Sequence, residues 1–121
     1  MPEVLFVSHD ADLRAVASRV LMMAGFEVTA AAHAGHASLA CIERGGFDVV
    51  VIEDGMADAS GEALAGRLRR YCPSAQVVWM CDARTAAHAD EIAVVRPFTA
   101  DDLIGAISDA THYARRRTTI R

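Results

Sequence analysis

The sequence predicts an open α/β sheet of five parallel strands with helices on both faces. Short apolar runs alternate with segments in which apolar residues recur every three or four positions. The central run, residues 48–52 (DVVVI), is β-branched and apolar on both faces of a strand, as in the middle of a parallel sheet. A chain of 121 residues can bury one such core, so we expect a single α/β domain.

The first half of the chain supplies three of these strands and two helices. Residues 3–7, 26–30 and 48–52 have the length and apolar character of buried strands. A helix is expected from Asp10 to a C-cap at Gly25, with an inward face formed by Leu13, Val16, Ala17, Val20, Leu21 and Ala24. A weaker helix is expected over residues 35–44, with Leu39 and Ile42 inward and two glycines at its end.

The second half repeats the pattern. Ser60 can cap a helix that carries Leu64, Leu68 and Tyr71 on one face and stops before Pro73. Strands are expected over 76–80 and 92–95. The stretch between them, residues 82–91, is polar and has room for one or two helical turns at most. Thr99 and Asp102 resemble a capping box at the start of the last helix, whose apolar residues are Leu103, Ile104, Ile107 and Ala110.

Charge and composition exclude several function classes. The net charge is −4, but residues 1–114 hold only 8 of the 12 arginines and all 16 acidic residues, a formal charge of −8. We therefore divide the chain into a domain (1–114), which should repel nucleic acid, and a basic tail (115–121). The three cysteines fit no disulfide framework or zinc motif and are expected to be buried. No apolar run would span a bilayer and no signal peptide is evident, so we expect a cytoplasmic protein without membrane contact.

Candidate functional residues follow the apolar runs, because ligands of open α/β sheets bind at the carboxyl ends of the strands. They are Ser8, His9 and Asp10 after the first strand, Glu53 and Asp54 after the third, Cys81 and Asp82 after the fourth, and Arg96 after the fifth. If the first, third, fourth and fifth strands are neighbours, Ser8, Glu53, Cys81 and Arg96 converge on one crevice.

Residues 47–61 (FDVVVIEDGMADASG) and 94–98 (VVRPF), together with the strand, polar cluster and helix at the N-terminus, resemble the receiver domain of two-component response regulators. The resemblance covers residues 3 to about 112. It implies a doubly wound, flavodoxin-like sheet in the order 2-1-3-4-5. The segment that would hold the family's fourth helix is shorter than usual by roughly two turns of helix.

The resemblance also implies a phosphorylation pocket, and this chain departs from it at almost every position. The two acids that hold Mg²⁺ in typical receivers fall on Ser8 and His9, and the phospho-accepting aspartate falls on Glu53. The hydroxyl residue that contacts the phosphoryl group falls on Cys81, and the lysine falls on Arg96. The aromatic switch residue falls on Ala93, and the proline that usually follows Met56 is Ala57.

These departures predict that the pocket needs no metal. Mg²⁺ prefers hard oxygen ligands, and of the three carboxylates only Glu53 remains, so we expect no cofactor and at most weak Mg²⁺ binding through Asp10 and Glu53. Glu53 and Arg96 balance each other in charge, and a guanidinium suits a bidentate carboxylate contact. We therefore predict a non-enzymatic, degenerate receiver in which phosphotransfer is extremely slow.

Several interpretations stay open at the level of the sequence. Glu53 either mimics a phosphorylated aspartate, merely satisfies Arg96 and nearby N–H groups, or keeps a residual active role. Asp54 is a less favoured phosphoacceptor, because alternate side chains of a strand point to opposite faces. His9 is either pH-sensitive or a partly exposed loop residue. The alternative functions are an active, phosphoryl-accepting regulator with an unorthodox site, and a small-ligand sensor.

The predicted mode of action is contact with another protein. The resemblance implies a histidine kinase, an output domain or another signalling protein as partner, and a homodimer is possible. The surface that we would test first combines Arg84, Ile92 and Val94 with the last helix. The arginine tail after Tyr113 either is solvated, docks an acidic partner or begins a linker to an output domain.

Overall fold

The computed structural model describes residues 1–54, 61–82 and 91–119, without the side chains of 113–119. These described residues form five strands and four helices in the order β1 (Glu3–Val7), α1 (Ala11–Met23), β2 (Glu27–Ala31), α2 (Ala34–Arg44), β3 (Val49–Glu53), α3 (Gly61–Tyr71), β4 (Gln76–Cys81), β5 (Ile92–Val95) and α4 (Ala100–Thr119). The predicted α/β class is confirmed. β3 and β4 extend one residue further than expected, so Glu53 and Cys81 are the last residues of their strands.

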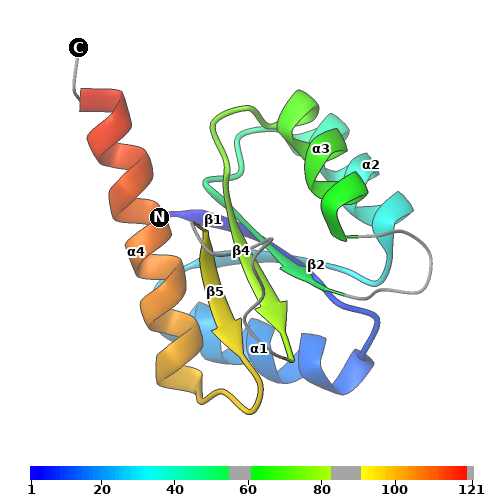
Figure 1. Cartoon of the computed structure of the whole chain (residues 1–121), viewed down its shortest axis with the longest axis vertical. Coiled ribbons are helices and arrows are strands. Elements are labelled where there is room, and N and C mark those ends of the chain that lie inside the picture. Colours follow the sequence, from blue (N-terminus) through cyan, green and yellow to red (C-terminus); the bar gives the residue numbers. More distant parts are fainter. Residues whose placement is uncertain (55–60, 83–90, 120–121) are drawn as a thin grey trace.

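All five strands are parallel and form one sheet in the order β2-β1-β3-β4-β5, which confirms the expected order. Helices α1 and α4 cover one face and α2 and α3 cover the other (Figure 1). Alternate residues of the central strand enter the two cores. Val49 and Val51 pack on the α1–α4 side, and Val50 and Ile52 pack on the α2–α3 side. All four side chains are fully buried, as a central parallel strand requires.

The helix starts agree with the sequence signals. Asp10 is the N-cap of α1, and its side chain accepts hydrogen bonds from the backbone N–H groups of Asp12 and Leu13. Thr99 and Asp102 form the expected reciprocal box at α4, with side-chain oxygens 3.1 and 2.9 Å from each other's backbone nitrogens. Gly25 follows α1 with a φ of 98°, a left-handed conformation that glycine adopts without steric cost.

The inward faces of three helices differ from those expected. Val16 of α1, Leu39 and Ile42 of α2, and Tyr71 of α3 are exposed by 42–61% rather than buried. The residues of α2 that face the core are small: Ala34, Ala37 and Cys41. Small side chains let a helix lie close to its neighbours, and this close approach turns the larger apolar residues of α2 outward.

Some predictions fall outside the described residues. They concern Met56, Ala57, the Ser60 cap, Arg84 and the short segment between β4 and β5. The backbone of α4 continues through residues 115–119, within the predicted basic tail, but the side chains there are likewise outside the description. In the described part of the chain, no helix combines the length and apolarity that crossing a bilayer requires.

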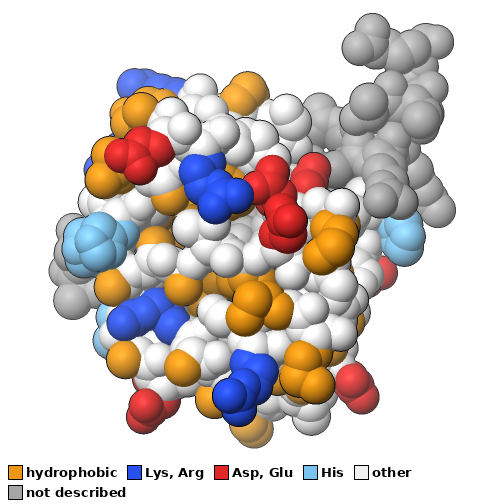
Figure 2. Space-filling model, turned by 180° about the vertical axis from the view of Figure 1, so that it is seen from behind, with side chains coloured by type: hydrophobic (Ala, Val, Ile, Leu, Met, Phe, Trp, Pro, Cys, Tyr) orange, Lys and Arg blue, Asp and Glu red, His pale blue; other side chains and the backbone are white. Residues whose placement is uncertain are grey.

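The surface carries charges of both signs. Figure 2 shows acidic and basic side chains interspersed with apolar ones on the face opposite to that of Figure 1. One exposed ion pair joins Arg44, the last residue of α2, to Glu3 of β1 at 2.9 Å. Both side chains are partly solvated, so the pair contributes little to stability.

Candidate functional site

The candidate site lies at the carboxyl end of the sheet and centres on a buried carboxylate. Glu53 ends β3, and its side chain is only 5% exposed. A buried carboxylate is costly unless hydrogen-bond donors and an opposite charge surround it. The structure supplies both from the ends of β1 and β5.

One oxygen of Glu53 accepts its hydrogen bonds from the residues after β1. The Ser8 hydroxyl and the His9 backbone N–H each lie 3.1 Å from Oε1, and His9 Nδ1 lies 2.5 Å from the same atom. Ser8 is fully buried, and its Oγ also accepts from the backbone N–H of Asp10 at 3.1 Å. Ser8 is therefore both a donor to Glu53 and a support for the turn that leads into α1.

Arg96 binds the other oxygen. Its Nη2 forms an ion pair with Glu53 Oε2, and its Nη1 lies 3.2 Å from Asp82 Oδ1. The predicted pairing with Glu53 is present but not bidentate, because the guanidinium fork divides between two carboxylates. A backbone hydrogen bond of 2.9 Å from Arg96 N to the Cys81 carbonyl fixes the position of Arg96 beside β4.

Four contacts thus hold the Glu53 carboxylate, three at Oε1 and one at Oε2, and two of them come from a histidine and an arginine side chain. The family resemblance implies a Mg²⁺ ion at this position, and the residues present do not fit it. Ser8 and His9 offer no carboxylate, and both oxygens of Glu53 already accept hydrogen bonds from the protein. Among the described residues, no group of three or more His, Cys, Asp or Glu side chains is placed to hold a metal ion.

The structure places three other predicted site residues, Asp54, Cys81 and Asp10, beside other groups. Asp54 lies toward α3, with Oδ1 3.5 Å from the position that a Cβ on Gly61 would take. The Cys81 thiol is buried and lies 3.7 Å from the Val94 carbonyl oxygen. Asp10 serves as the N-cap of α1 and directs its carboxylate to backbone N–H groups there.

Arg14 is a contributor that the sequence did not reveal. Its Nη1 donates to the Ser8 carbonyl at 2.8 Å, so a side chain from the first turn of α1 returns to hold the β1–α1 turn. The signal available in the sequence was its position four residues after the Asp10 N-cap, where a helical side chain lies over the preceding turn. Arg14 stabilises the backbone on which Ser8 and His9 are carried.

Trp79 was also missed, and it occupies the region of the expected switch. Trp79 of β4 lies beside Ala93 of β5 in the parallel register, and its ring is 2% exposed. The indole N–H donates to the Glu91 carboxylate, which lies 3.7 Å from Arg69 of α3. The small Ala93 packs against the same core as Trp79. A large ring, held at its polar end, fills the space beside Ala93.

The Trp79 ring also explains the glycine at the start of α3. A Cβ on Gly61 would lie 2.6 Å from Cζ3 of the ring, closer than packed atoms can approach. We expect Gly61→Ala to lower the free energy of unfolding by about 1–2 kcal/mol through overpacking, measured by urea denaturation. Gly66→Ala in the same helix is the control: its added methyl meets nothing within 4 Å, so it should stabilise by up to about 1 kcal/mol. Equal effects of the two substitutions would contradict the proposed clash.

The fold is that of an open, doubly wound α/β protein, and its candidate functional site lies at the carboxyl end of the central strand. Comparison with solved structures makes this more specific: the chain has the fold of response regulator receiver domains. It superimposes on a CheY-like receiver domain protein from Methanospirillum hungatei with a TM-score of 0.85 and 19% identity, over 97% of this chain and 98% of the other.

Two further structures show the range of proteins that share this fold. The chemotaxis protein CheY4 of Vibrio cholerae matches with a TM-score of 0.81 and 22% identity, over 91% of this chain and 98% of that one. A structure described as an adenylate cyclase from Rhodopirellula baltica matches with a TM-score of 0.86 and 19% sequence identity, over 97% of this chain and 92% of that one. No protein-family model and no curated protein sequence matches this chain.

Proposed function

We propose that this chain is a receiver-like module of two-component signal transduction that works without phosphorylation and without Mg²⁺. The observation that carries the proposal is that Ser8, His9 and Arg96 together hold both oxygens of Glu53. A carboxylate that accepts a phosphoryl group must direct an oxygen lone pair at the donor, and Oε1 of Glu53 is surrounded by Ser8 and His9 while Oε2 is held by Arg96. The family resemblance and the shared fold supply the link to signalling.

The electrostatics of the site agree with a permanently set state. In the typical receiver domains that this chain resembles, an aspartate gains negative charge on phosphorylation and a lysine then binds the phosphoryl group. Here Glu53 reaches one methylene further than an aspartate and meets Arg96 directly. A guanidinium keeps its charge at any physiological pH, so this contact does not depend on a modification. Glu53 is thus placed to act as a built-in substitute for the phosphorylated residue.

The residues of the usual switch support a fixed rather than a two-state module. The predicted switch positions hold Ala93 and Cys81, neither of which is an aromatic or hydroxyl side chain. The neighbouring Trp79 is buried, and Glu91 binds its indole N–H. Moving this ring would break a hydrogen bond and open a cavity in the α2–α3 core, which is costly.

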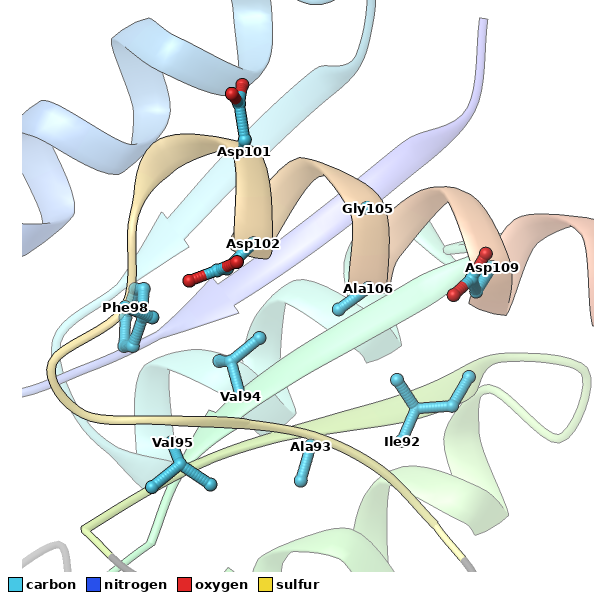
Figure 3. A pocket seen from close by; sticks show the side chains of 10 residues that line it. All are labelled: Ile92, Ala93, Val94, Val95, Phe98, Asp101, Asp102, Gly105, Ala106 and Asp109. Atoms are coloured by element: carbon cyan, nitrogen blue, oxygen red, sulfur yellow. The ribbon is translucent and has the colours of Figure 1, made fainter.

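A groove between β5 and α4 is the surface that we assign to the partner. It has a volume of about 450 Å³, and Ile92, Val94 and Phe98 contribute apolar side chains to it. Asp101, Asp102 and Asp109 of α4 line the same groove, and no basic residue is found among the described residues that line it (Figure 3). An apolar floor with three carboxylates favours a protein partner that presents apolar and basic side chains together. The predicted surface at Ile92 and Val94 is part of this groove.

The experiment that tests the proposal is the intact mass of the purified protein after incubation with a small acyl phosphate and excess Mg²⁺. We expect no added phosphoryl group on the native chain, because Ser8, His9 and Arg96 hold both oxygens of Glu53 and the acids that would hold Mg²⁺ are replaced. A receiver with the usual three acids, treated in parallel, must gain the phosphoryl mass for the result to count.

An added phosphoryl group on the native chain would overturn the proposal and identify an active regulator. Two variants then locate the acceptor. Loss of the modification in Asp54→Ala would show that the acceptor is the carboxylate after β3, and loss in Glu53→Gln would show that it is the buried one.

A further inference from the structure

The outer edge of β2 is a part of the sheet that the candidate site does not use. Among the described residues, β2 pairs with β1 alone, and α1 and α2 lie beside it on the two faces of the sheet (Figure 1). The Glu27 N–H donates to the Pro2 carbonyl at 2.9 Å, and the Ala31 carbonyl accepts on the same, β1 side. Because backbone groups alternate along a strand, the N–H and C=O groups of Val28 and Ala30 point away from the sheet.

The two edge strands of the sheet differ in their protection against further pairing. β5, at the other edge, has four residues, and Pro97 follows two positions after its end. Short strands and prolines commonly protect the edge of a sheet. β2 contains no proline or lysine, pairs with β1 in an unbroken register, and carries a single charge, at Glu27. An edge of this kind is a template for another strand.

An apolar groove borders the same edge. It has a volume of about 460 Å³, and its apolar lining comes from Met1, Met22 of α1, Phe26 and Val28. The Met1 and Met22 side chains are 78% and 55% exposed. Methionine side chains are flexible and adapt to the surface that packs on them. A strand placed along β2 would therefore gain apolar contacts in addition to its backbone hydrogen bonds.

We propose that a second copy of this chain occupies this edge, so that two β2 strands pair antiparallel and one sheet continues through both copies. The two-fold axis passes between the two Thr29 residues. Val28 then exchanges both backbone hydrogen bonds with Ala30 of the second copy, and Ala30 does the same with Val28. This register uses every outward backbone group of the strand. A shift toward Phe26 would not, because the Phe26 N–H already donates to the Leu21 carbonyl at 3.0 Å.

The charges that this register brings together are complementary. Glu27 comes opposite Ala31 of the second copy, so no like charges face each other. Ala31 packs in the α2–α3 core, Glu27 lies on the same face by alternation, and α2 begins three residues after Ala31. A two-fold axis perpendicular to the sheet leaves both α2 helices on that face. The Glu27 carboxylate is therefore directed toward the N-terminal end of α2 of the second copy, where backbone N–H groups favour a negative charge.

The shapes of the two ends of β2 also fit each other. Residues 30–32 are three alanines, whereas Phe26 and Val28 are at the other end beside Met22. Antiparallel pairing places the alanines of one copy along the bulky end of the other. Small side chains there leave room for the large ones, so the backbones can approach to hydrogen-bond distance. At the axis, Thr29 faces Thr29, and threonine pairs of this kind stabilise antiparallel strands. This fit favours a second copy over an unrelated segment.

Sedimentation equilibrium of the purified chain tests the proposal, at concentrations from about 1 to about 500 μM because a small interface is weak. The average mass should rise from that of one chain, 12.9 kDa, toward twice that value. Ala30→Pro removes an outward N–H and no hydrogen bond to β1, so it should keep the circular dichroism of the native chain but remain monomeric throughout. Ala30→Ser keeps the N–H and the small size, and this control should dimerise like the native chain. The dimer leaves Glu53 and the β5–α4 groove uncovered and does not depend on the function proposed above.

Two variants at the axis test the register. Thr29→Glu and Thr29→Arg each place like charges directly opposite one another and should be monomeric alone, whereas an equal mixture should form a heterodimer. This experiment does not require the proline variant to fold. A native chain that stays monomeric at every concentration would overturn the proposal, even if the edge took up a segment of a different protein. A dimer that Ala30→Pro leaves intact, or a mixture of the Thr29 variants without a heterodimer, would overturn it too.

Discussion

Replacing Arg96 by methionine should lower the free energy of unfolding by about 3 kcal/mol, a large effect for one residue at the edge of a sheet. The loss arises at Glu53 rather than at Arg96. Glu53 is 5% exposed and cannot recover water when its counter-charge is removed, whereas the Arg96 side chain is 32% exposed. Methionine keeps much of the length and apolar stem of arginine, so the change mainly removes the charge and its hydrogen bonds. Urea denaturation of both proteins measures the difference.

Two further proteins separate the buried charge from other effects of the substitution. Arg44→Met removes an arginine from the exposed pair with Glu3 and should cost no more than about 0.5 kcal/mol. Adding Glu53→Gln to Arg96→Met removes the buried charge itself, and most of the lost stability should return. If Arg96→Met cost as little as Arg44→Met, then Arg96 would not be what compensates the burial of the Glu53 carboxylate, and the proposed fixed state would lose its main support.

The sheet could be predicted from the sequence because strands have a period of two and parallel strands are buried on both faces. Residues 49–52 are apolar at every position, which predicts a strand buried on both faces, and their side chains do enter the two cores alternately. The helix faces were harder. Apolarity alone favoured Leu39 and Ile42 as the inward residues of α2, but the small residues Ala37 and Cys41 face the core instead. Which face of a helix turns inward depends on how closely its neighbours approach, and this is a property of the packed structure.

The candidate site was predictable to a similar extent. The rule that functional residues follow parallel strands placed Ser8, Glu53, Cys81 and Arg96 together. The structure has Ser8 and Arg96 in contact with Glu53, whereas the Cys81 thiol lies 3.7 Å from the Val94 carbonyl oxygen. The resemblance placed His9 in the pocket, but the contact of its ring with Glu53 was not predicted. Its side chain is 65% exposed, as expected of a loop residue, and yet its ring nitrogen binds Glu53. A backbone pattern places a residue at an edge of the sheet, but the rotamer decides which of its neighbours it contacts.

The role of Trp79 became visible only through the pairing of strands. A single tryptophan in an apolar run indicates a buried ring and nothing more. The register places it beside Ala93, and Gly61 supplies the space above the ring. The small residue at position 93 and the aromatic residue at position 79 are therefore parts of one packing arrangement. The sequence alone does not link them, because the two positions are far apart in the chain.

Restoring the missing carboxylates should convert the site into one that binds Mg²⁺. The triple variant Ser8→Asp, His9→Asp and Glu53→Asp changes the formal charge of the three positions and Arg96 from about zero to about −2, as in the receivers that the chain resembles. Without metal, the buried like charges should destabilise the variant by several kcal/mol. At a Mg²⁺ concentration about ten times the dissociation constant, binding should return about 1.4 kcal/mol. Thermal unfolding across a Mg²⁺ titration measures this, with Ca²⁺ and Na⁺ at matched ionic strength to separate binding from screening.

The control is the uncharged triple variant Ser8→Asn, His9→Asn and Glu53→Asn, which has nearly the same shape as the triple aspartate variant. The unfolding temperatures of this variant and of the native chain should not depend on Mg²⁺. The acidic variant should also gain phosphoryl mass from a small acyl phosphate, whereas the uncharged one should not. Such a result would mean that the fold retains the backbone geometry of a working receiver, and that three side chains separate a switchable site from a fixed one. If the acidic variant folded but ignored Mg²⁺, Arg96 and the shape of the pocket would be the obstacle. The replacement of the carboxylates alone would then not account for the lack of a group of metal-binding side chains among the described residues.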